Sequence, residues 1–124
     1  MTNYLTIGLL GIVGIFSRWL IDSFFHQWTQ IFPFGILIIN VLGSFIAGVV
    51  YVVGAEKIVI PPQLSVALLV GFCGGFTTFS AYSLQAFLYI EKGNLYQGIL
   101  YLCVSPILGL MGVFAGVYVA RYVA

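Results

Sequence analysis

Charge is what this sequence has least of. Of its 124 residues, 6% are Asp, Glu, Lys or Arg and 62% are hydrophobic, whereas about 25% of an ordinary soluble domain is charged. Because so little of the chain suits water, a protein that is soluble on its own is excluded. The stretches between the apolar runs are too short to form a separate domain, so the function must lie inside the bilayer.

Recognisable catalytic and metal-binding patterns are also missing. The two cysteines, Cys73 and Cys103, show no metal-site spacing, and we interpret them as packing residues. We find no Ser/His or Cys/His arrangement and no phosphate-binding glycine loop, and the single histidine, His26, falls in a predicted loop. We therefore expect neither an enzyme nor a nucleic-acid-binding protein.

Long uncharged runs are what the sequence does have. A bilayer core about 30 Å thick needs about 20 helical residues, and four runs reach that length, at residues 4–25, 33–54, 63–90 and 95–122. Their continuity excludes a membrane β-barrel, and no basic segment precedes the first run as in a cleaved signal peptide. We predict an all-α membrane protein, with residues 1–124 forming one domain of four transmembrane helices in the cell inner membrane.

The basic residues give almost no orientation signal. With four spans, Lys57 and Arg121 fall on one side of the membrane, and Arg18 and Lys92 on the other. The orientation of a membrane protein follows an excess of Lys and Arg near the helix ends on one side. With two basic residues on each side, almost no such excess exists. Either subtler cues select one orientation, or chains insert both ways and pair antiparallel.

The middle of the third run is unlike a membrane span. Three glycines there are closely followed by three hydroxyl residues, namely Gly71, Gly74, Gly75, Thr77, Thr78 and Ser80. Glycine tolerates an interruption, and irregular backbone persists in a membrane only where protein or a polar cavity satisfies it. A break would free carbonyl oxygens that can coordinate a cation. The alternative is an unbroken helix that uses its glycines for packing.

Neutral polar residues also occur within the other predicted spans. Asn40, Ser44 and Gly48 form one stripe on the second helix, and Tyr101 and Ser105 lie one turn apart on the fourth. A buried carboxamide such as that of Asn40 needs partners, either as a link between helices or as a donor lining a pathway.

Arg18 and Asp22 lie four apart on the first helix, and Phe79 and Tyr82 three apart on the third. The charged pair either neutralises itself near the membrane boundary, or Arg18 anchors a buried network or attracts anions. The aromatic pair either packs against neighbours or presents electropositive ring edges to a small anion.

No acidic residue falls at the predicted midplane, because Asp22, Glu56 and Glu91 all lie near helix ends. A proton-coupled exporter of cationic drugs needs a titratable carboxylate in the membrane. The neutral donors instead suit an anion that accepts hydrogen bonds strongly.

Four motifs resemble the small fluoride channels called Fluc or CrcB. They are GFCGGFTTFS at residues 71–80, PFG at 33–35, GSFIAG at 43–48 and GIFSRW at 14–19, and the resemblance covers nearly the whole chain. It implies an antiparallel, dual-topology homodimer with two fluoride pores beside a central sodium ion. It also implies passive export of cytoplasmic fluoride across the lipid bilayer.

The resemblance also implies roles for individual residues. Backbone carbonyls of the broken third helix would hold the sodium ion, and Arg18 would occupy a characteristic position of the first helix. Neutral and aromatic side chains would line or adjoin the pore. The implied carbonyls are those of Gly74 and Thr77, and the implied pore residues are Asn40, Thr78, Phe79, Ser80, Tyr82, Tyr101 and Ser105.

Two positions depart from the family pattern. Tyr82 stands where the family typically has phenylalanine, and Ile36 where threonine commonly follows the Pro-x-Gly turn. Two other functions stay open at this point: a dual-topology small-molecule or multidrug exporter, and a non-conducting membrane subunit of a larger complex.

Overall fold

The computed structural model describes residues 2–123, and the described chain contains helices and no strand. Within these residues, helices long and apolar enough to cross a membrane occur four times, over Asn3–Trp28, Phe34–Glu56, Pro62–Glu91 and Leu95–Val123. The four predicted apolar helices are therefore confirmed, and their ends differ from the predicted ones by only a few residues.

The first, second and fourth spans each contain one long α-helix. Helix α1 (Thr2–Phe25) is followed by the 3-10 turn η1 (His26–Trp28), and α2 (Phe34–Tyr51) continues as the π-helical turn η2 (Val52–Glu56). The fourth span is a single helix, α6 (Leu95–Val123).

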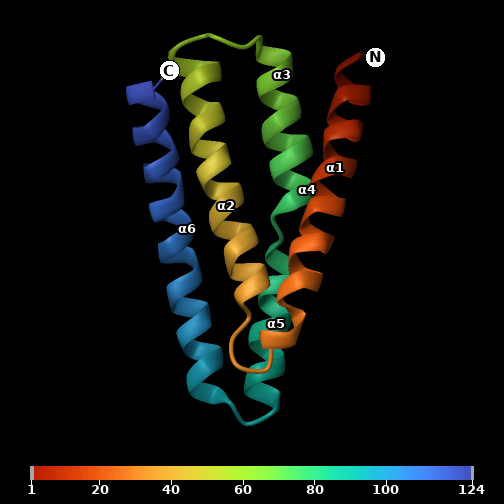
Figure 1. The fold of residues 1–124 in the computed structure, drawn as a ribbon, viewed down its shortest axis with the longest axis vertical. Helices are drawn as coiled ribbons and strands as arrows, with labels where there is room; N and C mark the ends of the chain where they lie inside the picture. Colours follow the sequence, from red (N-terminus) through yellow and green to blue (C-terminus); the bar gives the residue numbers. More distant parts are fainter. Residues whose placement is uncertain (1, 124) are drawn as a thin grey trace.

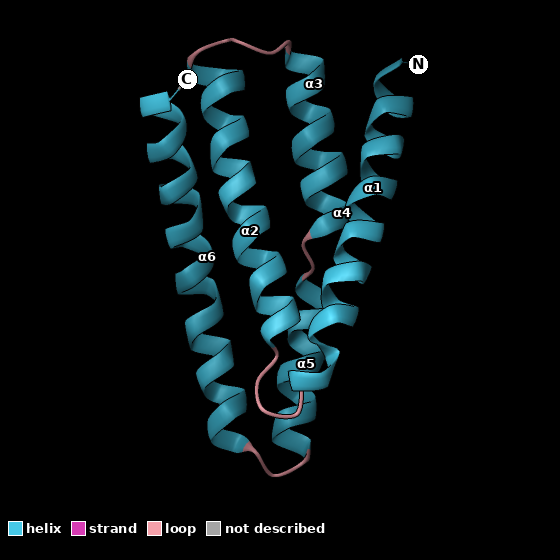
Figure 2. Ribbon diagram, in the orientation of Figure 1, coloured by secondary structure: helices cyan, strands magenta, loops and turns pink. Residues whose placement is uncertain are grey.

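The third span consists of shorter pieces. It begins with α3 (Pro62–Val66), whose first-turn proline suits a position where a backbone N–H has no helical partner. The chain continues through the π-helical segment η3 (Ala67–Cys73) and α4 (Gly74–Phe76), and then through α5 (Phe79–Glu91). A short extended segment separates α4 from α5 and appears as a pink interruption in Figure 2.

The spans run alternately up and down. Figure 1 shows that α1 begins, α6 ends and the η2–α3 connection lies at one end of the bundle, while the other two connections lie at the opposite end. Helix α2 packs against α6, α1 packs against η3 and α4, and α5 packs against α6. This arrangement places the extended segment within reach of both α1 and α2.

A glycine sets the close approach of α2 to α6. A Cβ atom built on Gly48 would lie 3.0 Å from the backbone nitrogen of Val117 and closer still to the carbonyl oxygen of Val113. Small residues allow membrane helices to pack backbone against backbone in this way. The packing of α2 on α6 in turn holds Asn40 and Ser105 on facing helices.

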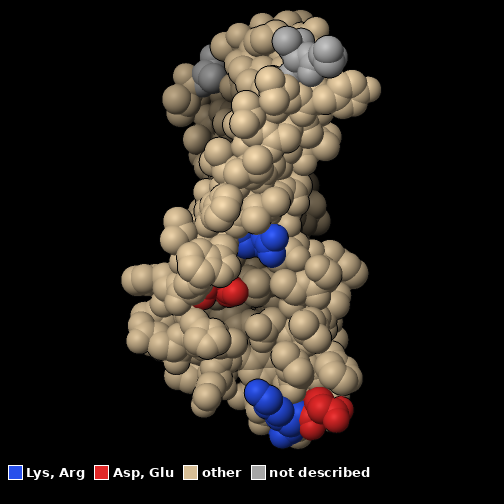
Figure 3. Space-filling model, turned by 90° about the vertical axis from the view of Figure 1, so that its right-hand side faces the viewer, with Lys and Arg blue, Asp and Glu red and all other residues tan. Residues whose placement is uncertain are grey.

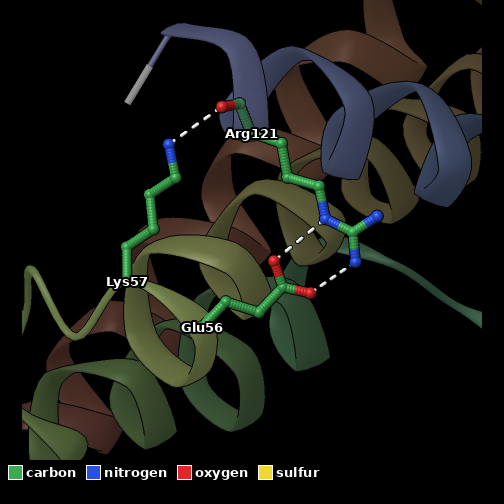
Figure 4. A network of polar contacts seen from close by, with 3 residues as sticks. All are labelled: Glu56, Lys57 and Arg121. Carbon is green, nitrogen blue, oxygen red and sulfur yellow. Dashed lines mark hydrogen bonds and ion pairs between the residues drawn. The ribbon is translucent and has the colours of Figure 1, made fainter.

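Charged side chains tie the end of α6 to the turn after α2. Arg121 donates to both carboxylate oxygens of Glu56, at 2.9 and 2.5 Å, and Lys57 Nζ donates to the Arg121 carbonyl oxygen at 2.9 Å (Figure 4). Among residues 2–123 this is the only ion pair. The cluster therefore joins the end of α6 to the start of the η2–α3 connection.

The outer surface is largely apolar. On α1, the side chains of Phe16, Trp19, Leu20 and Phe24 are all more than half exposed. Figure 3, which views the molecule from the α1 side, shows few charged atoms over most of the height of the bundle. An apolar surface of this extent needs hydrocarbon or another protein against it.

We predict that Gly48→Ala destabilises the fold by about 1–3 kcal/mol, because the added methyl group meets backbone that cannot move aside. Gly8→Ala is the matched control, since nothing lies within 4 Å of a Cβ built there, and it should be neutral or slightly stabilising. Unfolding in mixed detergent micelles measures both. Equal stability of the two variants would contradict the backbone contact.

Candidate functional site

The extended segment consists of Thr77 and Thr78. Thr77 has φ −85° and ψ 159°, and Thr78 has φ −153° and ψ 123°, values of extended rather than helical backbone. The end of α4 is closed by Thr77, whose backbone N–H and side-chain hydroxyl both donate to the Cys73 carbonyl oxygen, at 2.9 and 2.8 Å. The chain then leaves its helical path.

Asn40 on α2 satisfies the backbone of Thr78. The Thr78 N–H donates to Asn40 Oδ1 at 2.9 Å, and Asn40 Nδ2 donates to the Thr78 carbonyl oxygen at 3.2 Å. The Asn40 amide thus acts as a link between helices, and its second N–H stays available as a donor. The Thr78 hydroxyl accepts from the Ala81 N–H at 3.2 Å and so caps α5.

These bonds leave two carbonyl groups without their helical donors. In a continuous α-helix the N–H groups of Thr78 and Ala81 would donate to the carbonyl oxygens of Gly74 and Thr77. Here those N–H groups bond instead to Asn40 and to the Thr78 hydroxyl. Gly74 is exposed, and a Cβ built on it would meet only the Leu69 carbonyl oxygen, at 3.9 Å. Its backbone is therefore accessible from outside the chain.

The sequence left two alternatives for Arg18, an ion pair with Asp22 or an anchor for a buried network, and among residues 2–123 no ion pair joins Arg18 to Asp22. Arg18 Nε donates to the Gly75 carbonyl oxygen at 3.1 Å. The physical reason is the interruption, since the Gly75 carbonyl would otherwise receive the N–H of Phe79. Asp22 lies instead beside α2, where a Cβ on Gly35 would be 2.7 Å from its Oδ1 atom. Arg18 therefore belongs to the network around the break.

A cavity of about 480 Å³ lies beside the break, between α2, α5 and α6. Five of the predicted pore residues line it, and so does Thr77, whose predicted role was as a carbonyl donor. The lining residues are Asn40, Ser44, Thr77, Thr78, Phe79, Tyr82, Ser105, Pro106, Gly109, Leu110 and Val113. None of them is acidic or basic, so polar contacts in this cavity come from neutral groups.

Two predicted pore residues lie next to the cavity rather than on its wall. The Ser80 hydroxyl is 3.3 Å from that of Thr78. Tyr101 is fully buried, and its ring makes a T-shaped contact with Tyr82 at 5.0 Å between centroids. Within the described residues the Tyr101 hydroxyl has no hydrogen-bond partner. Ser80 and Tyr101 therefore support the wall instead of forming it.

The aromatic pair differs in exposure. The rings of Phe79 and Tyr82 lie 5.7 Å apart at an interplanar angle of 48°, but Phe79 is 80% exposed whereas Tyr82 is buried. The Tyr82 hydroxyl donates to the Leu102 carbonyl oxygen at 2.7 Å. Phe79 thus presents its ring at an open side of the cavity, where a second molecule can approach.

Several lining residues were not among the predicted ones. Ser44 follows Asn40 by one helical turn, and Gly109 follows Ser105 by one turn, so helical spacing signalled both. Leu110 and Val113 gave no signal, because apolar residues of a membrane helix look alike whether they face lipid, protein or a cavity.

A larger cavity, of about 610 Å³, lies away from the break. It is lined by residues of η1 and of the connection from η1 to α2, of α5 and of the α5–α6 connection, including His26, Gln85 and Lys92. None of the predicted site residues lines it. We take the smaller cavity as the candidate functional site, because the two residues of the break, Thr77 and Thr78, and the neutral donors line it.

The fold and this cavity define a class of protein, a small helical membrane protein with a cavity between its spans that is lined by uncharged residues. Residues 5–117 match the family described as CrcB-like protein, Camphor Resistance (CrcB), and the chain belongs to this family. The resemblance seen in the four motifs is therefore confirmed, and the chain is a multi-pass membrane protein.

Curated relatives match the chain over nearly its whole length. It is 35% identical over 122 residues to the fluoride-specific ion channel FluC of Chlorobium chlorochromatii, which covers 98% of this chain and 95% of that protein. It is 38% identical over 118 residues to the FluC of Hahella chejuensis, which covers 94% and 93%. With the FluC of Geobacter sulfurreducens it shares 34% over 122 residues, covering 98% of each. These relatives are named as ion channels and not as enzymes.

We predict that Asn40→Ala loosens the break. Both backbone groups of Thr78 would lose their partner, and each unsatisfied buried group costs about 1–3 kcal/mol. Hydrogen–deuterium exchange at the Thr78 amide should accelerate strongly, and thermal stability should fall. Asn3→Ala, at an exposed position outside this network, is the control. Unchanged exchange at Thr78 would contradict the pairing.

Proposed function

We propose that this protein is a fluoride-selective channel through which cytoplasmic fluoride leaves the cell passively. The observation that carries the proposal is the cavity at the break, which combines neutral donors and aromatic rings with no carboxylate. An anion entering it meets no repelling charge. The names of the relatives, fluoride-specific ion channels, support the choice of ion.

Fluoride accepts hydrogen bonds strongly, so a pathway must replace the water that it loses. The Ser105 hydroxyl lies on the cavity wall, and Asn40 Nδ2 uses one of its two N–H groups on Thr78 and keeps the other as a donor. The ring edge of Phe79 adds an electropositive surface without a formal charge. A partial positive surface lowers the cost of dehydration but holds the ion weakly enough to release it, as conduction requires.

Arg18 adds a permanent positive charge near this route. One of its N–H groups is bonded to Gly75, and a guanidinium has five. The remaining donors raise the local concentration of anions, and they cannot be lost by deprotonation. Arg18 thus has an electrostatic role as well as its hydrogen bond at the break.

The working unit in this proposal is an antiparallel homodimer with two pores. Phe79 is 80% exposed at the side of the cavity and the backbone at Gly74 is open, so a single chain leaves the site incomplete. The balanced distribution of basic residues allows both orientations in the membrane. A two-fold related copy would then close the site and provide a second, oppositely directed one.

A sodium ion at the dimer interface completes the proposal. The Gly74 and Thr77 carbonyls have lost their helical donors, and neutral backbone oxygens of this kind coordinate sodium in other interrupted membrane helices. One chain offers too few such oxygens, so the equivalent pair of a second copy is required. The bound ion would supply positive charge that stabilises the interface and the anions beside it.

Passive conduction suits a plasma-membrane location and needs no energy source. Fluoride enters a cell as the neutral acid and dissociates inside, so a selective leak lets the trapped anion out. The lining residues include no titratable carboxylate, which gives no support to a proton-coupled exporter. No described feature favours a non-conducting subunit either.

We expect purified protein in liposomes to release fluoride rapidly, measured with a fluoride electrode, while chloride movement stays negligible. Phe79→Ile should slow release by about tenfold or more, because a ring-edge contact of about 1.5 kcal/mol is lost. The matched control is Phe114→Ile, an exposed phenylalanine of α6 outside both cavities, which should keep the parental rate.

Different results of this assay would identify other functions. If folded, dimeric protein releases no fluoride from the liposomes, the channel proposal is overturned and a non-conducting subunit is favoured. Transport of organic cations that depends on a pH gradient would favour the exporter.

We predict that replacing sodium by N-methylglucamine lowers both fluoride efflux and the thermal stability of the dimer. The reason is that four facing carbonyl oxygens would repel one another without the ion. Ionic strength is kept constant, and crosslinking checks the two-chain species. If thorough removal of sodium alters neither stability nor efflux, the carbonyl site is wrong.

A further inference from the structure

Pro106 deprives one carbonyl group of α6 of its donor. In an α-helix the N–H of each residue donates to the carbonyl four residues earlier, and proline has no N–H. Pro106 lies inside α6, so the affected carbonyl is that of Leu102. Carbonyl groups point toward the C-terminal end of a helix, and this oxygen therefore faces Pro106, which lines the cavity.

Tyr82 supplies the missing donor from another span. Its hydroxyl donates to the Leu102 carbonyl oxygen at 2.7 Å, which joins α5 to α6. The Tyr82 ring also makes a T-shaped contact with the buried ring of Tyr101. Because a hydroxyl has a single proton, the Tyr82 hydroxyl has no donor left for an anion in the cavity.

We propose that Tyr82 is a positioning residue that neutralises the Leu102 carbonyl exposed by Pro106 and so removes a repelling oxygen from the anion route. A carbonyl oxygen carries partial negative charge, which acts strongly on an anion where water is scarce. Paired with the Tyr82 hydroxyl, the same oxygen repels an anion much less. This inference rests on the proposed fluoride conduction.

The bond also accounts for the residue type at position 82. Phenylalanine, the residue typical of the family at this position, would present the same ring but leave the Leu102 oxygen unpaired. Tyr82 and Pro106 therefore act together. Phenylalanine at position 82 should slow fluoride efflux only while residue 106 is proline. If Tyr82 acted by packing alone, the slowing of efflux by phenylalanine at position 82 would not depend on residue 106.

A double-mutant cycle tests this dependence. Wild type, Tyr82→Phe, Pro106→Ala and the double variant are reconstituted in liposomes, and fluoride efflux is measured per folded dimer. Tyr82→Phe should slow efflux on the order of tenfold in the parent. In the Pro106→Ala background, where residue 106 regains an N–H for Leu102, the same change should alter the rate by less than about twofold.

Tyr89→Phe is the matched control. It also removes a tyrosine hydroxyl from α5, one that donates to the Thr29 carbonyl and does not line the cavity at the break. Its effect on efflux should be the same whether residue 106 is proline or alanine. Any dependence on residue 106 equal to that of Tyr82→Phe would overturn the specific pairing.

A second measurement does not depend on conduction. With an isotope label on the Leu102 carbonyl, its infrared band should move to higher frequency in Tyr82→Phe and return in the double variant. An unmoved band, or equal slowing of efflux in both backgrounds of a conducting protein, overturns the inference and leaves the channel proposal intact. A wild type that conducts no fluoride overturns the channel proposal instead.

Discussion

The carboxamide of Asn40 binds both backbone groups of Thr78, and the geometry of the site follows from that pairing. In hydrocarbon, a peptide group that leaves a helix has no water to bond with, so an interruption needs a partner from elsewhere in the protein. Asn40 supplies a donor and an acceptor at once. Because the Thr78 N–H is engaged there, the Gly74 carbonyl loses its helical donor, and α5 restarts with Phe79 beside the cavity.

The same solution recurs at two other carbonyls that have lost a helical donor. Arg18 of α1 binds the Gly75 carbonyl, and Tyr82 of α5 binds the Leu102 carbonyl of α6. Each bond joins two spans and ends on a backbone oxygen. A net hydrogen bond is worth about 0.5–1.5 kcal/mol, but leaving a buried group unpaired costs about 1–3 kcal/mol. The network therefore specifies how the spans fit together more than it adds stability.

Much of this organisation could be predicted from the sequence, because composition and glycine placement act locally. The four apolar runs predicted the spans, and the spacing of polar and aromatic residues singled out Asn40, Ser105 and Phe79, which lie on the cavity wall. The partner of Arg18 could not be predicted, since the spacing to Asp22 is visible in the sequence and the unpaired Gly75 carbonyl is not. The bond from Tyr82 to Leu102 was hidden for the same reason, because it joins residues of different helices through a backbone atom.

An even number of spans has a consequence for joining two copies in one polypeptide. Helix α1 begins and α6 ends at the same end of the bundle (Figure 1). A short linker from the end of one copy to the start of the next therefore gives both the same orientation. A tandem gene for the antiparallel pair proposed above would have to include one additional crossing helix between its halves, and that linker helix would fix the opposed orientations.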